Sequence, residues 1–317
     1  MKLFLAPIQG TTVAYYRNIY NEIFGGIDAY YTPFISTSNK RSASKVLFKD
    51  LFKEKNNSEI KIIPQLLGNN GPDFRHYASV ITDMGYSDIN WNIGCPFSTV
   101  TKKKKGSGIL IYPDIIKSFL DEVSKDNSYN LTVKMRLGLN DIEEGIKVIK
   151  LLNDYPLNGV IIHGRTGKQM YKGNVDLDSF EILNSLSKHE ITYNGDIFTY
   201  NDFIKIQKRF PSINKFMLGR GALRDPFLAS KIKGNDIPNN KKLEKMKLFH
   251  DSIYNDFKSK LSGDRHLCDK MKEFWTYASM HLDSNGKLFK KMKKCHKCDD
   301  YLKIVNQIFN SSNSWID

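Results

Sequence analysis

Short apolar segments alternate with helical patterns eight times over about the first 230 of the 317 residues. Each apolar segment has the length and flanking residues of a strand, and each segment after it has the spacing of a helix. Several of these strands are apolar throughout, as strands covered on both faces are. We expect the strands at residues 3–6, 28–34, 60–67, 88–92, 131–135, 159–163, 191–194 and 215–218.

Polar residues stand at the carboxyl ends of nearly all the expected strands. They include Gln65, Asn92, Lys134, Arg136, His163, Arg165 and Asn194. Parallel strands that close into a barrel bring these ends to one face, where barrel enzymes build their sites from several strands. An open doubly wound sheet would gather such residues at one switch point. We therefore predict an α/β protein with a (β/α)8 TIM barrel, and the open sheet is the alternative.

The last quarter of the chain has a different character. Residues 234–240 are typical of a linker, and helical patterns follow at 242–260, 265–282, 288–292 and 299–309. We predict a catalytic barrel over residues 1–238 and a C-terminal all-helical domain over residues 239–317.

Positive charge is denser in that last part. The chain carries a net +14, and residues 241–317 alone hold 16 Lys and Arg against 10 Asp and Glu. Such a balance points to a polyanionic partner, either nucleic acid or a membrane surface. The N-terminal apolar run is too short for a signal peptide, and no run of about 18 apolar residues could span a membrane. We expect a cytoplasmic monomer that does not insert into a membrane.

Four cysteines, at positions 95, 268, 295 and 298, are too few and too scattered for a disulfide framework. Cys295 and Cys298 have the spacing of half a zinc site, which His266 and Cys268 would have to complete. We expect no metal.

Cys95 lies in the turn Gly94-Cys95-Pro96, directly after the strand that ends at Asn92. Pro96 cannot donate to a sheet ladder, so the strand must end there, and the turn can present the sulfur to a ligand. A free thiol is protonated at neutral pH and can donate a proton. A buried structural cysteine is the other interpretation of this residue alone.

Glycine turns follow the seventh and eighth expected strands. Asn194-Gly195-Asp196 and Gly219-Arg220-Gly221 each precede a helix. Barrels often bind a phosphate at this point through backbone N–H groups, and the arginine fork suits that anion. Lys134 and His163 would face the same open end, so the pattern favours a phosphate-bearing ring cofactor such as flavin mononucleotide (FMN).

Together these segments resemble the tRNA-dihydrouridine synthase family. The matching segments are Ala-Pro-Ile-Gln-Gly at 6–10, Gln65, Asn-Ile-Gly-Cys-Pro at 92–96, Val-Lys-Met-Arg-Leu-Gly at 133–138, His-Gly-Arg-Thr at 163–166, Asn-Gly-Asp at 194–196 and Gly-Arg-Gly-Ala at 219–222. They stand in the family's order across almost the whole barrel. The layout and the stretch around 270–277 are most similar to the bacterial C subfamily, which reduces uridine 16.

The resemblance implies a role for each matching residue. FMN and NADPH, or NADH, would be the cofactors, tRNA the substrate and Cys95 the proton donor. The flavin would lie against Pro7, Ile8, Gln9, Gln65, Lys134 and His163. Its phosphate would be held by Asn194, Gly195, Asp196, Gly219 and Arg220. The RNA would meet Asn92, Arg136, Arg165 and Tyr171, and Lys270 and Lys272 in the helical domain. The enzyme would reduce the C5=C6 bond of a uridine in the D-loop. That uridine would be number 16 if the chain belongs to the C subfamily.

Two departures from the family pattern concern the substrate more than the reaction. Thr12 and Val13 stand where the family usually has an Asp, and Lys102–Lys105 replace part of a small-residue segment. The four lysines either contact tRNA phosphates or form a solvated loop. Two other functions stay open: a flavin oxidoreductase acting on a free pyrimidine, and a non-catalytic tRNA-binding barrel.

Overall fold

The computed structural model describes residues 1–39, 45–283, 286–310 and 315, and its compact parts form two units. The first unit contains Met1–Thr12, Asp28–Asp196 and Gln207–Leu218. The second contains Val13–Ile27, Ile197–Ile206 and Gly219–Asp317. Every strand of the described chain lies in the first unit.

The first unit is built on one wholly parallel sheet. Its ten short strands are β1 (Lys2–Leu5), β2 (Ala29–Tyr31), β3 (Ile35–Ser36), β4 (Ile62–Ile63), β5 (Gln65–Leu67), β6 (Asp88–Ile93), β7 (Asn130–Arg136), β8 (Val160–His163), β9 (Ile191–Asn194) and β10 (Lys215–Leu218). They follow one another in the order β3-β5-β6-β7-β8-β9-β10-β1-β2-β4. Chain order is kept from β5 through β10, as a barrel requires.

Pro64 explains why ten strands make eight barrel positions. It separates β4 from β5 within one extended segment, because proline has no N–H for the ladder. β4 pairs with β2 on one side, and β5 pairs with β6 on the other, so residues 62–67 close the ring. Pro33 divides β2 from β3 in the same way. The predicted (β/α)8 TIM barrel is confirmed, and the open sheet is excluded.

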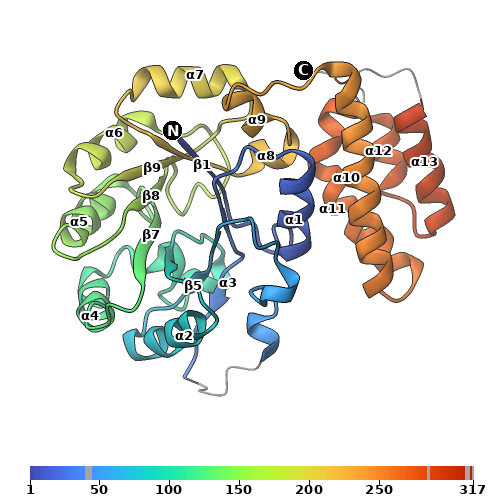
Figure 1. Cartoon of the computed structure of the whole chain (residues 1–317). Coiled ribbons are helices and arrows are strands. Elements are labelled where there is room, and N and C mark those ends of the chain that lie inside the picture. The colour runs from blue at the N-terminus through green and yellow to red at the C-terminus, as the bar shows by residue number, and fades with distance from the viewer. Residues whose placement is uncertain (40–44, 284–285, 311–314, 316–317) are drawn as a thin grey trace. The chain divides into compact units, whose positions relative to one another are not determined.

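Four helices of the first unit cover the outer face of β5–β9 (Figure 1). They are α2 (Gly71–Asp83), α4 (Pro113–Val123), α5 (Ile142–Leu152) and α6 (Leu177–Leu186). The outward side chains of the strands are apolar and pack beneath them. Trp91 of β6, which is fully buried, stacks on Phe119 of α4 with ring centroids 3.8 Å apart. Because strand side chains alternate, the neighbouring residues Asn90 and Asn92 project to the interior.

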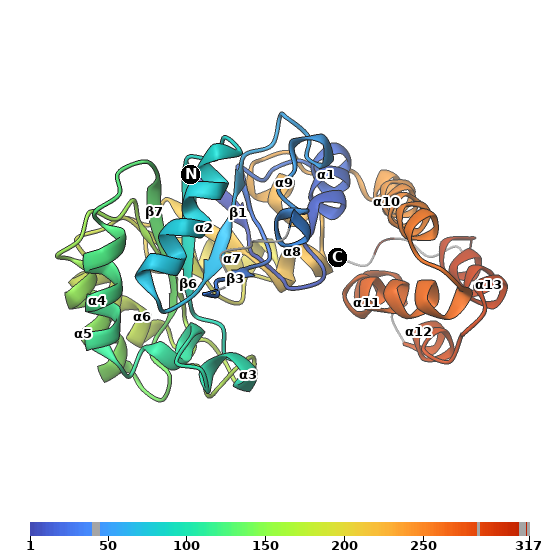
Figure 2. The ribbon, with the colours of Figure 1, turned by 90° about the horizontal axis from the view of Figure 1, so that it is seen from below.

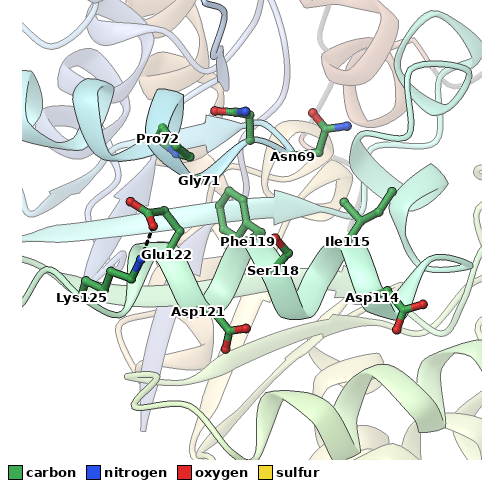
Figure 3. Close-up of a pocket in the computed structure, with 11 residues that line it drawn as sticks. Asn69, Gly71, Pro72, Asp114, Ile115, Ser118, Phe119, Asp121, Glu122 and Lys125 are labelled. Carbon is green, nitrogen blue, oxygen red and sulfur yellow. Dashed lines mark hydrogen bonds and ion pairs between the residues drawn. The ribbon is translucent and has the colours of Figure 1, made fainter.

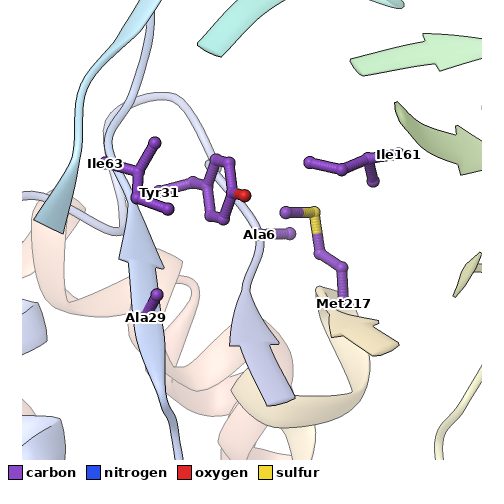
Figure 4. Close-up of a cluster of buried hydrophobic side chains, with 6 residues drawn as sticks. All are labelled: Ala6, Ala29, Tyr31, Ile63, Ile161 and Met217. Carbon is purple, nitrogen blue, oxygen red and sulfur yellow. The ribbon is translucent and has the colours of Figure 1, made fainter. Parts of the chain in front are cut away.

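Part of the barrel interior is a small apolar cluster. Side chains from β1, β2, β4, β8 and β10 face one another there (Figure 4). The cluster consists of Ala6, Ala29, Tyr31, Ile63, Ile161 and Met217, with Phe4 packed against it. The remaining inward positions, on β5, β6, β7 and β9, carry polar side chains, and these form the candidate site.

The second unit is helical. It holds α1 (Ala14–Ile23), α8 (Arg220–Arg224), α9 (Leu228–Ile232), α10 (Asn239–Lys260), α11 (Asp264–Leu282), α12 (Lys287–Met292) and α13 (Cys298–Asn310). Helices α10–α13 gather into one bundle (Figures 1 and 2). Phe249 of α10 packs edge-on against Tyr16, Tyr20 and Phe24, so α1 belongs to this unit and not to the strands that flank it in sequence.

Sequence expectations and structure differ mainly at element ends. α2 begins at Gly71 because the Asn70 side chain accepts a hydrogen bond from the N–H of Asp73. α10 begins at Asn239, inside the expected linker. Helix α7 (Tyr200–Arg209) is divided between the units, while α3 (Ser98–Thr101) and the short 3-10 turns were not expected. The all-helical C-terminal part is confirmed, and the boundary at residue 238 stays a prediction.

The helices that the structure describes include none that is long and apolar enough to cross a membrane.

Candidate active site

A row of polar side chains crosses the barrel interior. Gln65 donates to Asn90 and accepts from Asn92, each over 2.7 Å, and Asn90 donates to Thr132 over 2.9 Å. Gln65 and Asn90 are fully buried and Asn92 nearly so. Leaving such groups unpaired would cost about 1–3 kcal/mol each, so the three amides fix one another's orientation.

Lys134 extends this row on β7. Its Nζ donates to Asn194 Oδ1 on β9 over 2.9 Å, and Asn194 in turn donates to the backbone oxygen of Met217 over 2.9 Å. Burial inside the barrel and, to a smaller extent, the nearby charge of Arg136 lower the pKa of Lys134 to about 7. An ammonium group has three N–H donors, and the bond to Asn194 uses one of them.

The turn that carries Cys95 is held by the side chain of Asn92. Asn92 Oδ1 accepts from the backbone N–H groups of Gly94 and Cys95, at 3.0 and 2.9 Å. Burial raises the pKa of the Cys95 thiol, while the backbone N–H of Phe97 and the charges of Arg136 and Lys134 oppose that shift. The sulfur is therefore a protonated thiol at neutral pH, as a proton donor must be.

The segment after Cys95 folds back onto it. The Ser107 N–H donates to the backbone oxygen of Cys95 over 2.9 Å, and the Ser107 hydroxyl donates to the same oxygen over 3.2 Å. Gly106 has φ +56°, and a Cβ there would lie 2.4 Å from that oxygen. Only glycine fits this position, so the glycine that follows the lysine run serves to seat Cys95.

Arg136 ties the Cys95 turn to the loop after β8. Its Nε donates to the oxygen of Gly94 over 2.9 Å, and Nη1 donates to the oxygens of Thr166 and Met170 over 2.8 and 2.7 Å. The guanidinium lies over the ring of Tyr171, 5.4 Å from its centroid. The His163 ring is 6.4 Å from the same centroid. Arg136, His163 and Tyr171, all predicted to be site residues, are thus brought together.

Arg165 forms a second buried charged contact. Its side chain is 2% exposed and makes a bidentate pair with the carboxylate of Asp196. It also donates to the backbone oxygens of Lys172 and Gly173. This arginine fixes the loop that bears Tyr171 to the end of β9.

Three predicted flavin contacts, Pro7, Ile8 and Gln9, lie in the turn directly after β1. The buried hydroxyl of Thr12 accepts from the Ile8 N–H over 2.8 Å and so holds this turn. The departure from the family pattern at Thr12 therefore has a structural role. Among the remaining predicted residues, Gly219 and Arg220 belong to the second unit, and the Arg220 guanidinium lies over the Phe198 ring at 5.4 Å.

Lys270 and Lys272 occupy α11 and pair with carboxylates of the same helix. Lys270 bonds Glu273 over 2.6 Å, and Lys272 bonds Asp269 over 2.8 Å. Their side chains are 28% and 16% exposed. Their role in RNA binding stays a prediction.

A more exposed group of lysines lies on and just after α12. We call it the α12 lysine cluster; its members are Lys287, Lys290, Lys291, Lys293, Lys294 and Lys297, and all are exposed. It was not predicted from the sequence, although residues 287–298 contain six lysines and no Asp or Glu.

The Lys102–Lys105 run is neither uniform nor wholly solvated. Lys102, Lys103 and Lys104 are exposed, whereas Lys105 turns inward and donates to the backbone oxygen of Thr37 over 2.9 Å. Asn69 donates to the oxygens of Lys103 and Lys104, each over 3.2 Å. These contacts give the run a fixed course beside Cys95.

Two other features lie apart from these residues. A cavity of about 570 Å3 is lined by the start of α2 and one face of α4, including Asn69, Gly71, Asp114 and Glu122 (Figure 3). None of the predicted site residues lines it. Within the described residues, His, Cys, Asp and Glu side chains do not form a group of three that could hold a metal ion.

Comparison with known proteins agrees with the resemblance seen in the sequence. Residues 4–312 match the family model described as dihydrouridine synthase (Dus). The chain belongs to the dihydrouridine synthase family. A probable tRNA-dihydrouridine synthase of Staphylococcus epidermidis is 28% identical over 240 residues, covering 72% of this chain and 70% of that protein. A tRNA-dihydrouridine synthase B of Pasteurella multocida is also 28% identical, over 72% and 67% of the two chains. Assignment to the C subfamily stays a prediction.

Solved structures agree on the fold of this family member. Morphinone reductase in complex with tetrahydroNAD superposes with a TM-score of 0.53 at 8% identity, over 75% of this chain and 88% of the other. Histamine dehydrogenase from Rhizobium sp. 4-9 gives 0.54 at 11% identity, over 74% and 46%. At such low identity the similarity shows the barrel fold alone.

Proposed function

We propose that this protein is a tRNA-dihydrouridine synthase that reduces the C5=C6 bond of a uridine in tRNA, with FMN as cofactor and NADPH or NADH as reductant. The observation that carries the proposal is a protonated, buried thiol at the carboxyl end of a barrel strand, with the charges of Lys134 and Arg136 close enough to act on its pKa. When bound, FMN supplies hydride to C6 of the uracil.

The polar row fits the edge of a flavin ring. A planar ring with carbonyl oxygens and ring nitrogens needs donors and acceptors at fixed positions, and the amide of Gln65 and the remaining N–H groups of Lys134 supply them. A Lys134 pKa of about 7 would rise beside an anionic ring, so this residue suits charge that develops there. His163 and residues 7–9 would complete the ring site, as the resemblance implies.

The phosphate would be held by backbone N–H groups of Asn194, Gly195 and Asp196, together with Gly219 and Arg220. The Asp196 carboxylate is already paired with Arg165, so its part in phosphate binding would come from its backbone. Arg220 would supply the fixed positive charge.

Cys95 would donate the proton that C5 requires once C6 has been reduced. Asn92 holds the turn through Gly94 and Cys95, so one side chain would set both the direction of the thiol and one edge of the uracil. General acid catalysis by a placed side chain contributes roughly 10²–10⁴-fold in rate. The base must leave its stack to reach this thiol.

The helical unit would dock the tRNA. Lysines neutralise backbone phosphates and orient the RNA without reading bases. The α12 lysine cluster is better suited to this task than Lys270 and Lys272, because its ammonium groups are exposed and lie in a segment free of acidic residues.

The test is to map dihydrouridine in tRNA from a strain that lacks this protein, and then to restore it with the wild type or with Cys95→Ala. We expect one D-loop uridine, position 16 if the subfamily assignment holds, to stay unreduced without the protein and with the variant. The purified protein should be yellow and contain FMN. An unchanged tRNA pattern in the deletion strain, or a colourless protein active only on free uridine, would contradict the proposal.

A further inference from the structure

Phe97, two residues after Cys95, exposes its aromatic ring. The residue is 47% exposed, and the chain has 19 phenylalanines, all within the described residues. The other eighteen are buried or only partly exposed. Burying a phenyl ring stabilises a protein, so a ring left in water two residues from the thiol forgoes that stabilisation.

The backbone of Phe97 is fixed although its side chain is exposed. Its N–H contacts the Cys95 thiol and opposes the rise in the pKa of that group. Its carbonyl accepts from the N–H groups of Val100 and Thr101, at 2.8 and 2.9 Å, where α3 begins. The ring therefore starts from an anchored Cα directly beside the proton donor, and a change of the side chain leaves these backbone contacts in place.

Exposed lysines follow the ring within one short segment. Lys102, Lys103 and Lys104 are exposed, while the contacts from Asn69 and from Lys105 to Thr37 fix the backbone that carries them. We call residues 97–104 the Phe97 segment. It presents one aromatic ring and three ammonium groups on a backbone of defined course.

A second exposed ring is connected to the same turn. Tyr171 is 48% exposed and lies under Arg136, which also holds the Gly94 carbonyl of the Cys95 turn. Exposed aromatic rings interleaved with cations are typical of surfaces that bind single-stranded nucleic acid, where bases stack on the rings and phosphates meet the cations. The composition of the segment thus favours RNA over an apolar protein partner.

We propose that Phe97 stacks on the base next to the reacting uracil, while Lys102–Lys104 bind phosphates of the same strand. Extrusion of the uracil leaves its neighbour without a stacking partner, and an aromatic ring anchored beside the thiol replaces that partner. This inference rests on the proposed function and names the part of the substrate that the Phe97 segment recognises.

The test compares Phe97→Ala, Phe97→Leu and Phe97→Trp with the wild type. Ile182→Ala is the control, because Ile182 is 44% exposed on α6 of the same unit and is remote in sequence from the site. The probe is an unmodified tRNA transcript with 2-aminopurine at one neighbour of the mapped uridine, whose fluorescence is quenched by stacking. For each variant we would measure the dissociation constant for tRNA, KM and kcat. The rate of flavin reduction by NADPH is measured in the absence of RNA.

Removing the ring should weaken tRNA binding and raise KM by roughly 5- to 150-fold, since stacking of one base on an aromatic side chain has that effect. Phe97→Leu should behave like Phe97→Ala, because leucine is apolar but has no π face, and Phe97→Trp should restore binding and fluorescence quenching. Flavin reduction should be unchanged in all variants and in the control.

Binding and quenching of Phe97→Ala within about twofold of the wild type would overturn the inference, and so would full binding by Phe97→Leu. Replacing Lys102–Lys104 with Ala should also reduce the salt dependence of binding, and an unchanged slope would remove the lysines from the proposal. A wild type that binds tRNA through Phe97 but forms no dihydrouridine would refute the proposed reaction and leave the stacking role supported.

Discussion

The barrel and the helical bundle use positive charge in opposite ways. Inside the barrel, Lys134, Arg136 and Arg165 each have hydrogen-bond partners at 2.6–3.3 Å, and their surroundings are mostly buried. In the bundle, the α12 lysine cluster consists of six exposed side chains on and after one short helix. Burying the barrel cations costs desolvation free energy, so each of them needs particular hydrogen-bond partners. The exposed lysines of the cluster keep their hydration and need no particular partner.

The two kinds of positive charge suit the two proposed roles, catalysis in the barrel and RNA docking in the bundle. A buried cation is desolvated, so it must have hydrogen-bond partners, and its pKa responds to its neighbours. Exposed lysines are screened by salt and act together on a polyanion. Single substitutions should therefore have large effects in the barrel, whereas each exposed lysine of the bundle should contribute only a small part of the RNA affinity.

The largest effect is expected for Cys95→Ala. The variant should fold, bind FMN and accept hydride from NADPH, but form dihydrouridine roughly 10²–10⁴-fold more slowly, since only the proposed proton donor is removed. Stopped-flow flavin reduction and single-turnover reaction with tRNA separate the two steps. Near-normal turnover with tRNA would exclude Cys95 as the donor.

Arg165→Met tests whether the buried cations are structurally obligatory. The change leaves the Asp196 carboxylate without its buried partner, and breaking such a pair typically costs about 3–5 kcal/mol. The free energy of unfolding, from urea titration, is the measurement. Arg209→Met is the matched control, because Arg209 pairs with Asp178 and Glu181 at the surface and should cost less than about 1 kcal/mol. Equal destabilisation of the two variants would contradict the difference between buried and exposed cations.

Lys134 should make the stability of the FMN-free protein rise with pH. Burial lowers its pKa from 10.5 to about 7, so the unfolded chain binds more protons than the folded chain between these values. Stability then increases as pH rises through this range, by about 2 kcal/mol between pH 7 and pH 9. Urea titrations of the wild type and Lys134→Met at both pH values provide the comparison. The same pH dependence in both proteins would show that the lysine is not desolvated.

Features that depend on local sequence patterns could be predicted, whereas features that depend on contacts between distant segments could not. All eight barrel positions were predictable, because buried parallel strands leave continuous apolar runs and their carboxyl ends must share one face. The bond from Lys134 to Asn194 was not, since it joins strands 60 residues apart through a register that only the folded sheet defines. The same holds for the grouping of α1 with the bundle, which depends on aromatic packing against Phe249.

Two features were visible in the sequence and still missed. Phe97 follows Cys95 closely, but a single Phe gives no sign of whether its ring is exposed. The α12 lysine cluster was a plain charge run, yet the predicted RNA contacts were Lys270 and Lys272. The acidic residues three positions away, Asp269 and Glu273, can be read from the sequence, and the structure adds that they form ion pairs with these lysines.

The smallest effects are expected for lysine pairs on the helices, and these compare docking surfaces directly. Lys290→Ala with Lys291→Ala should lower the log–log salt slope of tRNA binding by roughly 0.7–0.9 for each phosphate that is no longer neutralised, and raise KM several-fold. The double change of Lys147 and Lys150 to Ala is the control, because both residues are exposed on α5 of the barrel and the charge change is identical. Lys270→Ala with Lys272→Ala should give an intermediate result, since each ammonium must leave a carboxylate before it meets a phosphate.

Flavin reduction by NADPH should stay normal in all three double variants. A larger decrease in affinity from the α11 pair than from the α12 pair would assign docking to α11, and an equal decrease from the α5 pair would show that net charge alone guides the RNA.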